Sequence, residues 1–220
     1  KNDAIALMLA GKNWTEAREV LRTRYERVLK RVDQIKPEEV FETVMNAYAR
    51  TFDPHSSYFS PRNSEEYKIQ MSLNYEGIGA SLQLVDEYVT IMNLIEGGPA
   101  AVAGTLSVKD RITAVGQGTS GPMTDVVGWR IDDVVQLIRG KGNTVVRLQI
   151  LPVGAVPGSP EKTLQFTRGK VTLEAQAARK TLRSVKRDGR DLKVAVINVP
   201  GFYSDYDAAR AGDENYRSTT

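Results

Sequence analysis

The sequence contains no cysteine and a single histidine, His55. A disulfide framework, a thiol nucleophile and a Cys/His zinc site are therefore excluded for these 220 residues. A Ser-His-Asp triad would have to use His55, which lies in the proline-bounded loop 53–61 beside Ser56 and Ser57. Neighbours in sequence rarely converge as a triad requires. We therefore expect a structural role for His55, and neither a metal nor another cofactor.

A strong charge imbalance and long apolar runs are also missing. Lys and Arg number 30 against 27 Asp and Glu, a net charge of +3, which is too small to indicate a nucleic-acid partner. No apolar run approaches the ~18 residues of a membrane span. The chain also has no signal-peptide pattern, and it starts and stops abruptly. We therefore expect that the chain does not span a membrane, and that it is a piece of a longer precursor.

Two amphipathic helices are predicted near the start of the chain. Asn13 and Glu16 form a capping-box pattern, and apolar residues then recur at spacings of three and four as far as Ile35. Pro37 suits the first turn of a second helix, whose apolar stripe extends to Tyr48. We interpret both stripes as core-facing surfaces.

From Ser72 the apolar period changes from 3.6 to 2, which indicates strands. The predicted order is two strands, a short helix ending at Gly104, a strand, a long loop, a helix and two more strands. The strands are expected at 80–84, 88–94, 111–115, 144–151 and 163–167, and the second helix at 131–138. This order is compatible with a small β-barrel capped by two helices.

A Gly-Ile-Gly loop at 77–79 leads into the first of these strands, in which Ala80, Leu82 and Leu84 share one parity. Glycine lets a backbone approach another group closely, and consecutive N–H groups in such a turn form a nest for an anion. The strand edge beside the nest suits an extended peptide whose terminal carboxylate enters the nest. A PDZ domain recognises the C-terminus of a peptide in this way. The alternative interpretation of the loop is an ordinary glycine turn before a strand.

A second glycine cluster, Gly116–Gly121, matches the G-x-G-x-x-G pattern after a predicted strand. A dinucleotide site requires a helix that opens directly on those glycines within a βαβ unit. Pro122 follows instead, and the next helical pattern starts near Ile131. We therefore reject a dinucleotide site and interpret the cluster as a flexible loop.

The last part of the chain is predicted to form a β-hairpin. Segments 178–185 and 192–199 flank Asp188-Gly189, a dipeptide suited to a tight turn. Val194–Ile197 is nearly continuous apolar sequence, as in a strand buried on both faces. Such a strand needs further elements to cover it, and these 220 residues do not supply them.

Taken together, several stretches resemble the C-terminal processing peptidase family, the tail-specific proteases of the Prc type. The matching stretches are 53–63, 71–80, 98–101, 126–130, 137–142 and 198–203, in the family's order. The resemblance implies an α+β chain in three parts. These are an N-terminal helical region (1–71), a PDZ domain (72–169) and the truncated beginning of an α/β protease core (170–220).

The resemblance also implies a periplasmic serine endopeptidase that degrades or processes proteins selected by their apolar C-terminal residues. The family's serine nucleophile and lysine base follow a later glycine-rich segment. We therefore assign no catalytic residue here and expect this chain to be inactive by itself. The alternative is a non-enzymatic PDZ adaptor or inhibitor that binds C-termini, and an adaptor protein is a possible partner.

Two sets of peptide-binding residues follow from the resemblance. The carboxylate-binding loop is matched by Gly77, Ile78, Gly79 and Ala80. The groove walls are matched by Leu82 and Leu84 on the strand and by Val134, Val135 and Ile138 on the helix.

Overall fold

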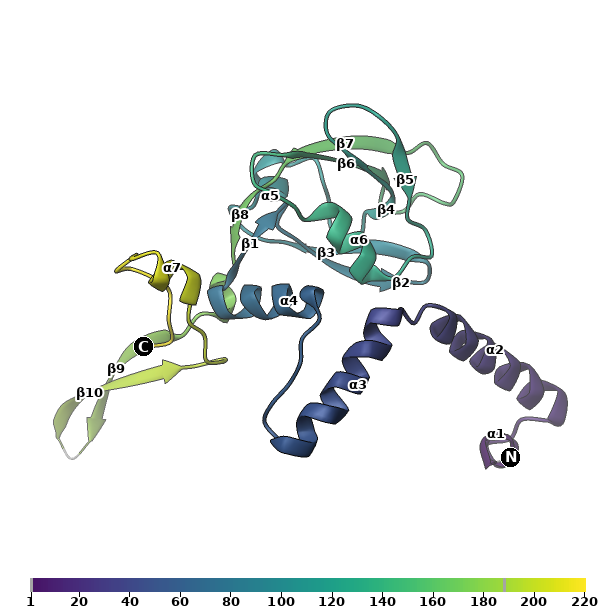
Figure 1. Cartoon of the computed structure of the whole chain (residues 1–220), viewed down its shortest axis with the longest axis horizontal. Helices are drawn as coiled ribbons and strands as arrows, with labels where there is room; N and C mark the ends of the chain where they lie inside the picture. The colour runs from purple at the N-terminus through teal and green to yellow at the C-terminus, as the bar shows by residue number, and fades with distance from the viewer. Residues whose placement is uncertain (1, 188) are drawn as a thin grey trace. The chain divides into compact units, whose positions relative to one another are not determined.

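The computed structural model describes residues 2–187 and 189–220 (Figure 1). The chain divides into two compact units, one up to Ser64 and one from Glu65 onward. None of the helices in the described residues combines the length and hydropathy that crossing a bilayer requires.

The first unit is helical, as its sequence predicts. It contains α1 (Asn2–Leu9), α2 (Trp14–Asp33), α3 (Pro37–Phe52) and the start of α4 (Pro61–Ser72). The predicted capping box opens α2, since Glu16 N–H donates to Asn13 Oδ1 at 3.0 Å and Asn13 N–H donates to Glu16 Oε2 at 3.1 Å. Both interactions satisfy N–H groups that a helix end leaves without intrahelical partners.

The apolar stripes of α2 and α3 are not buried, so the prediction that they face a core is wrong for this chain. Ala17 is the only buried apolar residue among those described up to Ser64. Leu29 is 62% exposed, Val44 60% and Phe52 75%. Helical periodicity reports that a face is apolar, but burying it needs a facing element, which the described part of this unit does not provide.

The loop after α3 is organised by Asp53. Its carboxylate accepts from the His55 N–H at 3.1 Å and from the Ser56 hydroxyl at 2.7 Å, and these bonds lower the pKa of Asp53, with the Ser56 bond the larger cause. The His55 side chain is 90% exposed and lies 3.4 Å from Asp53 Oδ1. Ser56 therefore donates to Asp53 and not to His55, which is the geometry of a turn.

The second unit holds a six-stranded antiparallel sheet in which β2, β3, β4, β6 and β7 are neighbours in that order and β5 pairs with β4. These strands are β2 (Ala80–Val85), β3 (Tyr88–Leu94), β4 (Arg111–Gln117), β5 (Met123–Asp125), β6 (Val145–Leu151) and β7 (Lys162–Thr167). The helices are α5 (Pro99–Ala103) and α6 (Ile131–Ile138), and Figure 1 shows α6 beside β2. The predicted order of strands and helices is confirmed, except that β5 lies in the stretch that was predicted as a long loop.

Alternating side chains of the sheet and one face of α6 form the core. Val89, Ile91, Ile112, Val146 and Leu148 are fully buried, and they pack with Val134 and Ile138 of the helix. Burial of apolar surface on this scale is the main stabilising contribution to a domain of this size.

A two-stranded sheet is separate from the six-stranded sheet. Strand β1 (Asn74–Gly77) pairs antiparallel with β8 (Gly169–Thr172), so that Gly77 lies opposite Gly169. Both strands are short, and the sequence pattern did not predict them. Their pairing brings the start of the glycine loop next to the end of the barrel.

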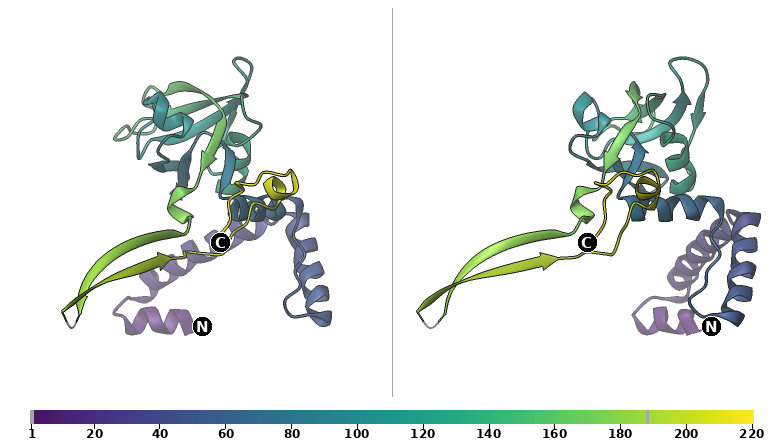
Figure 2. Two further views of the ribbon diagram at one scale, coloured as in Figure 1. Left: turned by 90° about the vertical axis from the view of Figure 1, so that its left-hand side faces the viewer. Right: turned by 60° about the vertical axis from the view of Figure 1, so that its left-hand side comes forward.

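The predicted hairpin is present as β9 (Arg179–Arg187) and β10 (Arg190–Asn198), which pair from Arg187–Arg190 outward. Of the predicted turn, Asp188 lies outside the described residues, and Gly189 has φ +74°. Figure 2 shows the two strands as a long twisted ribbon. Every described residue of both strands is exposed, including Val194–Ile197. This agrees with the expectation that these 220 residues do not supply the elements that would cover the strand.

The segment after β10 folds back on itself. Ser204 bridges to Ser218, Tyr203 N–H donates to Thr219 Oγ1 at 2.8 Å, and the short helix α7 (Tyr206–Arg210) lies between them. The Tyr203 hydroxyl accepts from the Ala178 N–H at 3.1 Å. These bonds hold residues 200–203 near the start of the hairpin.

Candidate peptide-binding site

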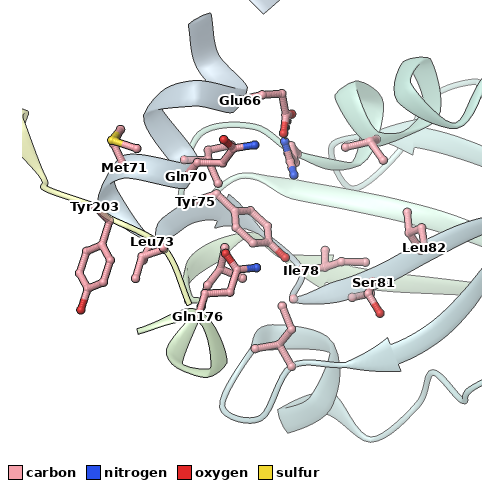
Figure 3. Close-up of a pocket in the computed structure, with 18 of the residues that line it drawn as sticks. Glu66, Gln70, Met71, Leu73, Tyr75, Ile78, Ser81, Leu82, Gln176 and Tyr203 are labelled. Carbon is pink, nitrogen blue, oxygen red and sulfur yellow. Dashed lines mark hydrogen bonds and ion pairs between the residues drawn. The ribbon is translucent and has the colours of Figure 1, made fainter. Parts of the chain in front are cut away.

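A cavity of about 670 Å³ lies between β2 and α6 and continues toward α4 (Figure 3). Its barrel side is lined by Ile78–Leu82 of the glycine loop and β2, and by Val135, Ile138 and Arg139 at the end of α6. Its other side is lined by Glu66, Ile69, Gln70 and Met71 of α4 and by residues 200–203. Cavities of this size, mostly apolar with a few polar groups, are typical ligand sites.

Strand β2 is an edge of the sheet, because its only neighbour is β3. Its second edge therefore has no strand partner in the described residues, and α6 lies beside it. An unpaired strand edge is a template for adding an extended peptide.

The glycine loop is held by its carbonyl groups. Ile95 N–H donates to Gly79 O and Ala100 N–H donates to Ile78 O, each at 2.8 Å. Gly79 has φ +77°, and a Cβ there would lie 3.0 Å from the Gly98 Cα. A side chain at residue 79 would therefore be strained and would collide with backbone.

Two N–H groups of the same loop lack a protein acceptor among the described residues. Ile78 and Gly79 are both buried, yet in the described residues neither of their N–H groups donates to a protein acceptor. A backbone N–H that no protein acceptor satisfies needs another partner, because an unpaired donor away from water is costly. Two adjacent donors that line a cavity form a site complementary to an anion.

The structure brings most of the predicted site residues to this one cavity. Ile78, Gly79, Ala80, Leu82, Val135 and Ile138 line it. Three others do not. Gly77 is buried against Tyr75, Val134 points into the core with no exposed surface, and Leu84 is 42% exposed farther along β2.

Arg139 and Glu66 add charged groups to the cavity, and Tyr75 lies beside them. Sequence reasoning gave these three residues no role. The Arg139 guanidinium forms an ion pair with Glu66 of α4 and lies over the Tyr75 ring, with Cζ 4.8 Å from the ring centroid. Burial raises the pKa of Tyr75, and the nearby charge of Arg139 offsets part of that effect. Figure 3 shows Glu66 and Tyr75 among the residues that line the cavity. The stretch 137–142 contains Arg139, but no spacing rule connects it to Glu66.

Arg168 binds carbonyl groups at the C-terminal end of α6. It is 4% exposed, and its guanidinium donates to Ile138 O at 2.8 Å, Leu137 O at 2.9 Å and Gln117 Oε1 at 2.7 Å. Cations at a helix C-terminus satisfy the last carbonyl groups and complement the helix dipole. Arg168 therefore holds the helix end that carries Ile138 and precedes Arg139.

Two family models match this chain. Residues 1–62 match the tail specific protease N-terminal domain, and residues 66–151 match the PDZ domain. A tail-specific protease from Haemophilus influenzae is 40% identical over 203 residues, which is 92% of this chain. The chain is a homologue of the tail-specific proteases.

The homology covers only part of the relatives. The chain spans 28% of the length of the Haemophilus influenzae protein. A probable CtpA-like serine protease from Staphylococcus haemolyticus is 35% identical over 56% of this chain and 22% of its own length. Among solved structures, the PDZ domain of a carboxy-terminal protease from Vibrio cholerae, crystallised in complex with peptide, is 44% identical. That match has a TM-score of 0.43 and covers 46% of this chain and all of that domain.

Proposed function

We propose that this chain is the substrate-recognition portion of a protease that selects proteins by their apolar C-terminal residues. The observation that carries the proposal is that the N–H groups of Ile78 and Gly79 have no protein acceptor in the described residues and lie beside the edge of β2 that no described strand pairs with. A peptide that adds as a strand to β2 would place its terminal carboxylate at these donors.

The preference for an apolar last residue follows from the lining of the cavity. Ile78, Leu82, Val135 and Ile138 line it, and we propose that they surround the last side chain of the ligand. A charged side chain there would lose its hydration without gaining a partner, which is unfavourable. Gly77 and Ala80 would shape the loop, and Leu84 and Val134 would support the groove from outside the cavity.

The match to a tail-specific protease N-terminal domain favours a protease over a free-standing PDZ adaptor or inhibitor. We propose a serine nucleophile and a lysine base outside these 220 residues, a periplasmic location and an adaptor protein as a possible partner. We also propose the division into a helical region (1–71), a PDZ domain (72–169) and the start of a protease core (170–220). The pairing of Gly77 with Gly169 supports an end of the PDZ domain near that residue.

The test is calorimetric titration of the chain with a peptide that ends in apolar residues, as the free acid and as the carboxamide. Hydrogen bonds to a charged acceptor contribute about 1.5–3 kcal/mol each, so the amide is expected to bind about tenfold to a hundredfold more weakly. A third peptide with Asp as the last residue is expected to bind weakly too. Equal affinities of acid and amide would contradict the assignment of the loop.

A further inference from the structure

We propose that Arg139 is a second recognition group for the terminal carboxylate of the ligand, and that Glu66 is the counterion that positions and screens it in the empty site. The inference rests on the proposed function, because it takes the carboxylate to bind at the loop 77–79. It adds a charged side chain to a site that sequence reasoning built from backbone donors alone.

The position of Arg139 supports this role. It follows Ile138 at the end of α6, and its Cγ lies 3.7 Å from where a Cβ on Gly77 would stand. Arg139 therefore stands at the loop end of the groove and lines the same cavity as Ile78 and Gly79. Leu84, near the other end of β2, does not line that cavity.

The guanidinium of Arg139 has N–H donors that are not used by other described residues. Its Nη1 bonds to Glu66 Oε1, while Nε and Nη2 have no hydrogen-bond partner among the described residues. The Arg139 side chain is 29% exposed, so it is partly shielded from solvent and still accessible to a ligand. The guanidinium fork matches a carboxylate in geometry, which makes arginine the usual partner for such groups.

The neighbours of Arg139 allow its guanidinium to exchange the Glu66 carboxylate for the carboxylate of a ligand. Glu66 is 47% exposed, so water can solvate its carboxylate when a ligand competes for the cation. Stacking on Tyr75 keeps the guanidinium in place during that exchange, since a cation is attracted to the face of an aromatic ring. Glu66 also places a negative charge near the site, which disfavours an anionic ligand.

The experiment compares peptide acid and amide on variants of this chain. Arg139→Gln is expected to weaken binding of the acid about five- to tenfold and binding of the amide less than twofold, as for loss of a partly shielded charge pair. Arg139→Lys keeps the charge without the fork and is expected to restore part of the difference. Glu66→Gln is expected to strengthen binding of the acid about two- to threefold and to leave the amide unchanged.

Arg130→Gln is the matched control, because it removes the same charge at the opposite end of α6 from a residue outside the cavity lining. It is expected to leave the acid-to-amide ratio unchanged. If Arg139→Gln weakens acid and amide equally, Arg139 only packs the site and the proposal is wrong. If thermal unfolding shows that Arg139→Gln does not fold, the Glu66→Gln variant is the test. An acid-to-amide affinity ratio equal to that of the wild type in Glu66→Gln contradicts the proposal.

The two proposals fail in different ways. A wild-type chain that binds acid and amide equally contradicts the proposed function and this inference together. A wild-type chain that prefers the acid, with Arg139→Gln preferring it equally, contradicts only the role of Arg139.

Discussion

The two glycine loops of the second unit share a Gly-x-Gly pattern but differ in which backbone groups are paired. In the loop 77–79 the carbonyls of Ile78 and Gly79 accept hydrogen bonds, and their N–H groups have no protein acceptor in the described residues. In the loop 116–121 the N–H of Gly118 donates to Val145 O at 2.9 Å. The carbonyls of Gly118 and Gly121 accept from Arg147 at 3.0 and 2.9 Å.

The difference decides what each loop can bind. The first loop offers donors beside a cavity and suits an anion. In the second loop the carbonyl groups are already bonded to the side chain of Arg147, and the loop lines no part of that cavity. A glycine pattern in the sequence therefore does not identify an anion site. The backbone group that remains unpaired does, and distant segments determine which one that is.

Gly79→Ala is expected to have the largest effect. The substitution forces a Cβ onto a residue with φ +77° and toward the Gly98 Cα. We expect a loss of about 2–3 kcal/mol in the free energy of unfolding, and an affinity for the peptide acid reduced at least about thirtyfold. Chemical denaturation and calorimetry measure the two effects. Unimpaired binding would show that the loop geometry is not needed for recognition.

Arg147→Met is expected to have an intermediate effect on stability and none on binding. It removes the hydrogen bonds to Gly118 O and Gly121 O, although water can reach these carbonyls in their exposed loop. The free energy of unfolding is expected to fall by about 1–2 kcal/mol. The acid-to-amide ratio is expected to stay the same, and a change in that ratio would mean that the two loops are coupled.

Gly118→Ala is expected to have the smallest effect. Gly118 has φ +66°, but a Cβ there would meet no atom within 4 Å. Only the left-handed backbone conformation is penalised, at about 1 kcal/mol. It is the matched counterpart of Gly79→Ala, because both residues have positive φ and only Gly79 faces backbone. Peptide affinity within twofold of wild type is the expected result, and a larger loss would contradict the contrast between the loops.

Apolar periodicity predicted the elements of the barrel well, because their apolar faces are buried in one core. The strand 88–94 and the helix 131–138 were predicted with the bounds that the structure gives. The same reasoning failed for burial in α2 and α3, whose apolar residues are exposed. Periodicity is a property of one element, whereas burial depends on a second element that faces it.

Sequence alone determined that the chain contains a small β-rich domain with two helices, a glycine loop at the start of a strand and no cysteine chemistry. These follow from local patterns of apolar residues, glycine and proline. Only the tertiary structure decided that β2 is an edge, that Val135 lines the cavity while Val134 fills the core, and that Glu66 reaches Arg139. Each depends on contacts between segments far apart in the chain, and no local pattern of side chains encodes which of their groups will meet.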